Sequence, residues 1–264
     1  MVSGVTTSPT SATVTLPRPI SHGDRESSMV ALTFDDAPHP EFVPRLLALF
    51  RAENVKVTFF LVGEPLRRFP DVAKAIVADG HEIGNHSLNH RNLLRAQAPA
   101  AEDEIVGMQR LIREQLGATC TLYRPAFGVA SNEVKRICER EHLSIILWDV
   151  DTNDWREGST RETIVRNVLD NVNHGSIVLF HATHLRSIEA AAELIPILRA
   201  RGYELVTVSK LLEDRARREQ IRRLSPKRDS SPSARDRSPN KPESVSPSDD
   251  RATPVIQIPV LPTP

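Results

Sequence analysis

The segment TRETIVRNVLDNVNHGSIVLFHATHLRSIEAAAELIPILRARGYELVTV, residues 160–208, contains the pattern that decides the fold. Its run SIVLF is almost continuously apolar, which is typical of a strand in a parallel sheet that is covered on both faces. Apolar residues recur at helical spacing before and after this run, and the second helical segment ends at Gly202, a common helix stop. Helices and strands in alternation predict parallel βαβ units.

The same alternation continues toward the N-terminus and predicts an α/β architecture. We expect strands at residues 29–34, 57–62, 81–85, 121–125, 144–150, 176–181 and 203–208. Amphipathic helical segments separate most of them, which fits either a doubly wound sheet or a barrel. No glycine-rich phosphate loop follows the first strand, where a nucleotide-binding sheet would need one. In a barrel, functional residues gather at the carboxyl ends of the strands.

The two ends of the chain differ in composition from its middle. Residues 1–28 are rich in Ser, Thr and Pro, and residues 224–264 mix Ser, Pro and charges of both signs. Such segments bury too little apolar surface to offset the entropy lost on ordering, so we expect both to be disordered. Residues 29–223 are expected to form one folded domain.

Charge and hydropathy exclude several classes of function. Lysine plus arginine and aspartate plus glutamate number 34 each, so no net charge draws the chain to nucleic acid or to an anionic membrane. No apolar stretch is long enough for a membrane span, and none near the N-terminus resembles a signal peptide. The default expectation is a cytoplasmic monomer.

Polar clusters follow five of the predicted strands. They are Asp35 and Asp36, the run HSLNH at 86–90, RPAFG at 124–128, DTNDW at 151–155, and His181. Because the carboxyl ends of parallel strands meet on one side of a barrel, these clusters predict a single site.

The run HSLNH suggests a metal centre. His86 and His90 are four residues apart, and on a helical turn they would share one face. Ser87 stands where a helical metalloprotease motif has its glutamate, so that reading fails. One of the adjacent aspartates can supply a third ligand while the other faces the substrate, since neighbouring residues of a strand diverge. Two imidazoles and a carboxylate suit Zn²⁺ best, with Co²⁺, Ni²⁺ or Mn²⁺ as alternatives.

Acid and base groups complete this hypothesis. Water at such a metal becomes a nucleophile near neutral pH, and the uncoordinated aspartate would take its proton. Arg124 is a suitable partner for that aspartate. His181 would protonate the leaving group, with Asp154 holding its imidazole in the correct tautomer.

In this order and spacing, TFDDAP, HSLNH, RPAFG, DTNDW and LFH resemble the five motifs of the polysaccharide deacetylases, carbohydrate esterase family 4 or the NodB-homology domain. The similarity covers about residues 29–210. It implies a distorted (β/α) barrel, similar to a TIM barrel but usually with seven strands. It also implies removal of N-acetyl groups from chitin-like oligomers or peptidoglycan, and a family that is often secreted or associated with the cell envelope.

The resemblance further implies a role for each matching residue. Asp35 would be the catalytic base and His181 the acid, with Arg124 orienting Asp35 and Asp154 tuning His181. Asp36, His86 and His90 would hold the metal. The substrate would be bound by the backbone N–H of Phe127, which would stabilise the oxyanion, and by Trp155 and Leu179, which would line the pocket for the acetyl methyl group.

Two departures from the family pattern bear on substrate preference. Ala37 stands where the family usually has Gly, which is tolerable only if the backbone there keeps a negative φ. Ala126 replaces a second proline and should loosen the loop that carries Arg124. Two alternatives stay open: an O-acetyl esterase of the xylan type with the same site, and a catalytically silent member that only binds glycans.

Overall fold

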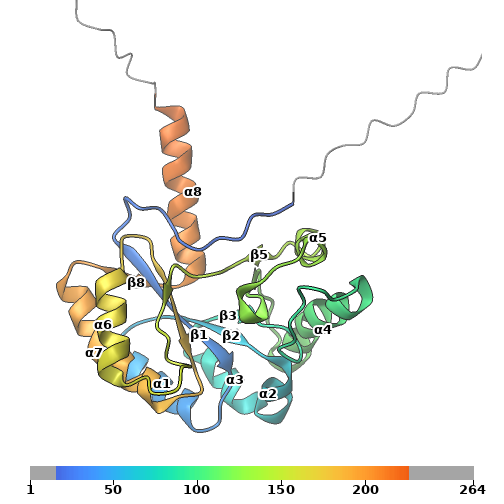
Figure 1. Ribbon diagram of the computed structural model, residues 1–264, viewed down its shortest axis with the longest axis horizontal. Coiled ribbons are helices and arrows are strands. Elements are labelled where there is room, and N and C mark those ends of the chain that lie inside the picture. Colours follow the sequence, from blue (N-terminus) through green and yellow to red (C-terminus); the bar gives the residue numbers. More distant parts are fainter. Residues whose placement is uncertain (1–15, 226–264) are drawn as a thin grey trace, which may run out of the picture. The chain divides into compact units, whose positions relative to one another are not determined.

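A parallel sheet forms the core of the fold, and its longest strand, β1 (Met29–Ala37), pairs with β2, β7 and β8 (Figure 1). The computed structural model describes residues 16–225. Its strands follow the order β5-β4-β3-β2-β1-β7-β6, and β8 pairs with the first residues of β1. The other strands are β2 (Thr58–Leu61), β3 (Glu82–Asn85), β4 (Leu122–Tyr123), β5 (Ser144–Ile145), β6 (Val150–Asp151), β7 (Ile177–His181) and β8 (Glu204–Val206). All seven predicted strand regions therefore contain strands, and the predicted distorted (β/α) barrel is confirmed.

Helices surround this sheet because each presents one apolar stripe to it. In α1 (Phe42–Ala52), for example, Val43, Leu46, Leu47 and Phe50 are buried at spacings of one turn. Phe50 reaches Phe34 of β1 at 5.3 Å between ring centroids, and Phe34 also stacks on Phe180 of β7 at 5.1 Å. The remaining helices are α2 (Gly63–Arg68), α3 (Pro70–Ala78), α4 (Ala98–Leu116), α5 (Asn132–Arg140), α6 (Arg161–Asn171), α7 (Leu185–Ala200) and α8 (Val208–Leu224), with a short 3-10 helix at Ala126–Gly128.

The strand predicted at residues 144–150 is divided into two. β5 pairs with β4, whereas β6 pairs with β7 at the other end of the strand order. The intervening residues 146–149, which we call the seam, lead from one end of the sheet to the other. Asp149 in the seam accepts a hydrogen bond from the Ile177 N–H at 2.8 Å. The seam is still mostly apolar because Ile146 is buried and Trp148 packs against the core, although this segment has left the regular ladder.

Residues 20–28, which we call the N-terminal strap, lie against the barrel. Ile20 forms a parallel bridge with Ile146, and the Gly23 N–H donates to the Gly175 carbonyl at 2.7 Å. Arg25 and Asp149 form an ion pair of 2.8 Å. The prediction of a disordered segment up to residue 28 therefore does not hold for the strap, because backbone hydrogen bonds and charge pairs replace the apolar burial that it lacks. The predicted disorder of residues 1–15 and 226–264 falls outside the described residues.

The described part of the chain contains no helix that is both long and apolar enough to cross a membrane. Its last helix, α8, ends at Leu224, next to the predicted domain boundary, and extends away from the barrel (Figure 1).

Candidate active site

The residues predicted for the site meet at the carboxyl ends of the strands, around a cavity of about 490 Å³. Of the predicted residues, those that line this cavity are Asp35, Asp36, His86, His90, Phe127, Trp155, Leu179 and His181. Arg124 and Asp154 lie behind the lining and are fully buried. A fully buried positive charge and a fully buried negative charge each require a partner. Both have one at the cavity wall.

Asp35 is the partner of Arg124. The Arg124 Nη1 donates to Asp35 Oδ1 at 2.7 Å and to Thr33 Oγ1 at 2.8 Å. The guanidinium lies 4.0 Å above the Phe60 ring, which closes it off from water. Burial lowers the pKa of Arg124, and the charge of Asp35 opposes this effect. The pair holds a carboxylate at the cavity with its Oδ1 fixed by a positive charge.

Asp36 turns away from Asp35 because its backbone is left-handed, with φ at 63°. The pairing of β1 with β2 changes register between Phe34 and Ala37, so the two aspartates no longer alternate as on a regular strand. Asp36 Oδ1 lies 3.5 Å from His90 Nε2 and 3.7 Å from His86 Nε2. The three side chains form a group whose ligand atoms are all within 4.8 Å of one another.

The hydrogen bonding and burial of these histidines suit a metal. His86 Nδ1 lies 2.7 Å from the Arg124 carbonyl oxygen, which can only accept, so Nδ1 carries a hydrogen and Nε2 is the nitrogen that faces Asp36. Burial, with the nearby His86, lowers the pKa of His90 and favours its neutral form. The donor set of two imidazoles and one carboxylate therefore fits a divalent cation. The predicted helical turn is wrong, because Ser87 and His90 have positive φ and the segment is a loop.

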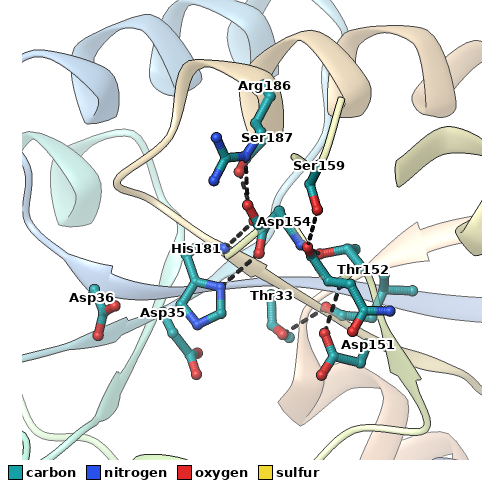
Figure 2. Close-up of polar contacts among 12 residues, drawn as sticks. Thr33, Asp35, Asp36, Asp151, Thr152, Asp154, Ser159, His181, Arg186 and Ser187 are labelled. Carbon is teal, nitrogen blue, oxygen red and sulfur yellow. Dashed lines mark hydrogen bonds and ion pairs between the residues drawn. The ribbon is translucent and has the colours of Figure 1, made fainter. Parts of the chain in front are cut away.

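His181 at the end of β7 is held by Asp154 (Figure 2). His181 Nδ1 lies 2.7 Å from Asp154 Oδ1, while Asp154 Oδ2 accepts from the His181 N–H at 2.7 Å and from Ser187 Oγ at 2.6 Å. Burial alone would lower the pKa of His181, but the hydrogen bond and charge of Asp154, with the charges of Asp35 and Asp36, raise it to about 9. His181 is therefore protonated at neutral pH.

The sequence model of the polysaccharide deacetylases matches residues 22–144. A peptidoglycan N-acetylglucosamine deacetylase of Bacillus cereus is 37% identical over 196 residues, which cover 72% of this chain and 70% of that protein. The chain belongs to the polysaccharide deacetylase family. The peptidoglycan N-acetylmuramic acid deacetylase PdaC of Bacillus subtilis is 34% identical, over 74% of this chain and 41% of that longer protein.

Solved structures of this deacetylase family have the same fold. The Bc1960 peptidoglycan N-acetylglucosamine deacetylase superposes with a TM-score of 0.71 at 34% identity, over 73% of this chain and 92% of that one. A family 4 pseudoenzyme from Bacillus anthracis also reaches a TM-score of 0.71, at 31% identity over 74% and 69% of the two chains. Membership of the family is thus compatible with an active or a silent site, and the side chains present have to distinguish them.

The walls of the cavity carry two exposed aromatic side chains. Phe127 is 63% exposed and has a left-handed backbone with φ at 61°. Trp155 is 50% exposed, and the Arg156 guanidinium lies 5.1 Å from the centre of its ring. Leu179 is buried at the base. Exposed rings beside a polar cavity are suited to the apolar faces of sugars.

The motifs left two contributing residues undetected, Thr33 and Ser187. Thr33 receives the second hydrogen bond of Arg124 Nη1 and itself donates to the Val178 carbonyl at 2.7 Å. Its position two residues before Asp35, on the same face of β1, was a signal that could have been used. Ser187 on α7 lies 33 residues from Asp154, and no local pattern connects them.

Ala37, one of the two departures from the family pattern, does not have a positive φ, so the condition for tolerating it is met. The left-handed residue of this turn is Asp36 instead. Ala126 is buried at the start of the 3-10 helix.

Proposed function

We propose that this chain is a metal-dependent hydrolase that removes N-acetyl groups from amino-sugar glycans. The observation that carries the proposal is the presence, around one cavity, of a charged base–arginine pair, a three-residue metal group and a histidine held by a buried carboxylate. Hydrolysis of an amide needs these functions together, since the nucleophile must lose a proton and the amine must gain one.

Asp35 is assigned as the base. Its Oδ1 is occupied by Arg124 at 2.7 Å, and its Oδ2 lies 3.5 Å from His86 Nε2, on the side of the metal group. A water between Asp35 and the acetamide carbon would give its proton to this carboxylate as it attacks. Arg124 keeps the carboxylate oriented during the transfer.

Asp36, His86 and His90 would hold the cation. When bound, it supplies a Lewis acid that lowers the pKa of water and polarises the acetamide carbonyl. Zn²⁺ fits these ligands best, and Co²⁺, Ni²⁺ or Mn²⁺ are the alternatives. The backbone N–H of Phe127 is assigned to the oxyanion that develops on the carbonyl oxygen.

His181 is assigned as the acid. With Nδ1 bound to Asp154, its proton on Nε2 is available to the nitrogen of the leaving amine. Transfer of this proton breaks the carbon–nitrogen bond and releases acetate and the free amino sugar. Trp155 and Leu179 are assigned to the acetyl methyl group.

The surroundings favour an oligomeric glycan over a single sugar. A second cavity of about 640 Å³ shares Asp36 and His90 with the first and continues past His39, Arg68 and Asn89. A chain of sugars could therefore extend from the reacting acetamide into this second cavity. Relatives are named as deacetylases of peptidoglycan and of chitooligosaccharides, which supports the same class of substrate.

Acetate release tests the proposal. Purified protein, loaded with each candidate metal in turn, is incubated with N-acetylglucosamine oligomers, with peptidoglycan and with acetylated xylan. We expect acetate from an N-acetylated glycan. Acetate from xylan alone would identify an O-acetyl esterase, and none from any substrate, with metal bound, would overturn the proposed hydrolysis and leave the silent glycan-binding alternative.

A further inference from the structure

We propose that Ile20 of the N-terminal strap is a positioning residue for Arg124 and, through Arg124, for Asp35. The role of Asp35 in this statement rests on the proposed function. The strap lies on the outside of the barrel and contributes nothing to the lining of the cavity. Its effect is exerted through backbone hydrogen bonds.

Arg124 depends on the seam for two of its acceptors. Its Nε donates to the Ile146 carbonyl at 3.4 Å, and its Nη2 donates to the Leu147 carbonyl at 3.2 Å. Together with Thr33 and Asp35, these carbonyls set the plane of a guanidinium that is fully buried. A buried guanidinium without its acceptors is costly, so the position of the seam decides where Arg124 can sit.

The strap supports the seam at the same residues. The Ile20 N–H donates to the Ile145 carbonyl at 2.8 Å, and the Leu147 N–H donates to the Ile20 carbonyl at 2.7 Å. These two bonds enclose Ile146, whose N–H donates to Tyr123 of β4 and whose carbonyl faces Arg124. Ile20 therefore takes the place of a neighbouring strand where regular pairing of the sheet has stopped.

The strap has further anchors that do not involve Ile20. Gly23 is hydrogen-bonded to Gly175, Arg25 pairs with Asp149 at 2.8 Å, and Asp24 pairs with Arg222. A change that removes only the Ile20 N–H should therefore release the seam at one point while the rest of the strap stays attached.

Ile20→Pro in the full chain removes this donor, since proline has no N–H, and it also shortens a side chain that packs against the core. The matched control is Arg18→Pro. Arg18 is exposed, its backbone N–H donates to no residue of the range 16–225, and it already lies between two prolines. We expect Ile20→Pro to lower kcat of acetate release about fivefold, the value of one net hydrogen bond, with KM and metal content unchanged. Arg18→Pro should behave as the wild type.

A double-mutant cycle separates positioning from general weakening. Lysine at position 124 cannot reach both seam carbonyls, so in the Arg124→Lys background Ile20→Pro should change kcat by less than about twofold. Equal effects of Ile20→Pro in both backgrounds would overturn the proposal, because the strap would then act independently of Arg124.

A measurement without substrate makes the inference independent of the proposed function. The Nε–H signal of Arg124 in NMR spectra, assigned by its loss in Arg124→Lys, should exchange with water at least about tenfold faster in Ile20→Pro than in Arg18→Pro. Unchanged exchange would overturn the inference, even if the protein proved to be inactive. So would an Ile20→Pro protein that no longer folds, because the strap would then hold the whole barrel and not one arginine.

Discussion

Replacing Asp154 with asparagine should move the alkaline limit of activity to lower pH. His181 can donate a proton only while it is protonated, and its pKa is raised to about 9 against the burial that would otherwise lower it from 6.5. Asp154 makes the leading contribution to this rise, ahead of Asp35 and Asp36. A cation at Asp36 would weaken the contribution of Asp36 to the pKa of His181 but leave the contribution of Asp154 in place.

The size of the shift follows from these values. At pH 8 a group with a pKa of about 9 is about 90% protonated, whereas a group at about 6.5 or below is at most about 3% protonated. The rate at pH 8 should therefore fall about 30-fold from protonation alone. Misorientation of the ring in Asp154→Asn adds a loss that does not depend on pH, so the position of the alkaline limb is the decisive quantity.

The assay is kcat/KM for acetate release between about pH 5 and pH 10, with the limb expected to move down by about 2.5 pH units. Ser187→Ala is the control, because it removes one donor to Asp154 but leaves the carboxylate on His181. Its limb should move much less. An alkaline limb near pH 9 in Asp154→Asn would refute the assignment of His181 as an acid tuned by this carboxylate.

Four other outcomes are expected. Asp35→Asn and His181→Ala should each lower kcat by roughly 10²–10⁴, while bound zinc, measured by mass spectrometry, stays near one per chain; unchanged turnover would contradict the mechanism. His90→Ala should empty the metal site and leave the folded state intact by circular dichroism. Thr33→Val, which loses the hydroxyl next to Arg124 Nη1, should cost about 1–3 kcal/mol of stability in denaturant titrations, and Thr33→Ser much less. In metal-free protein the raised pKa of His181 contributes fully to the free energy of unfolding below about pH 6.5. Up to about 3 kcal/mol of that free energy should be lost as the pH rises through about 9. Asp154→Asn should remove this pH dependence.

Much of the candidate site could be anticipated from the sequence because each motif sits directly after a strand. Asp35 and Arg124 are 89 positions apart, yet both lie at the carboxyl ends of parallel strands, and the barrel brings such ends together. The strands themselves were visible as apolar runs. The apolar runs did not reveal that residues 144–150 leave the ladder part-way. Apolar residues stand on both sides of the break between β5 and β6, so the sequence pattern does not mark it.

The strap and the loop of HSLNH were mispredicted for different reasons. Ile20 is joined to the seam by backbone groups, which every residue except proline possesses, so its neighbours in the sequence carry no signal of the contact. In HSLNH the spacing of the histidines fits a helix, but positive φ at Ser87 and His90 brings both rings to Asp36 from a loop. Spacing alone does not distinguish these backbones.

The seam has a consequence for how this barrel varies. β5 and β6 stand at opposite ends of the strand order yet are separated by only four residues of chain, so the barrel is closed there by a covalent connection and not by a ladder of hydrogen bonds. An insertion at residues 146–149 would enlarge the circumference without removing any strand pair. Because Trp148 of the seam also lines the active-site cavity, the width available to a sugar can change there while the rest of the sheet keeps its register.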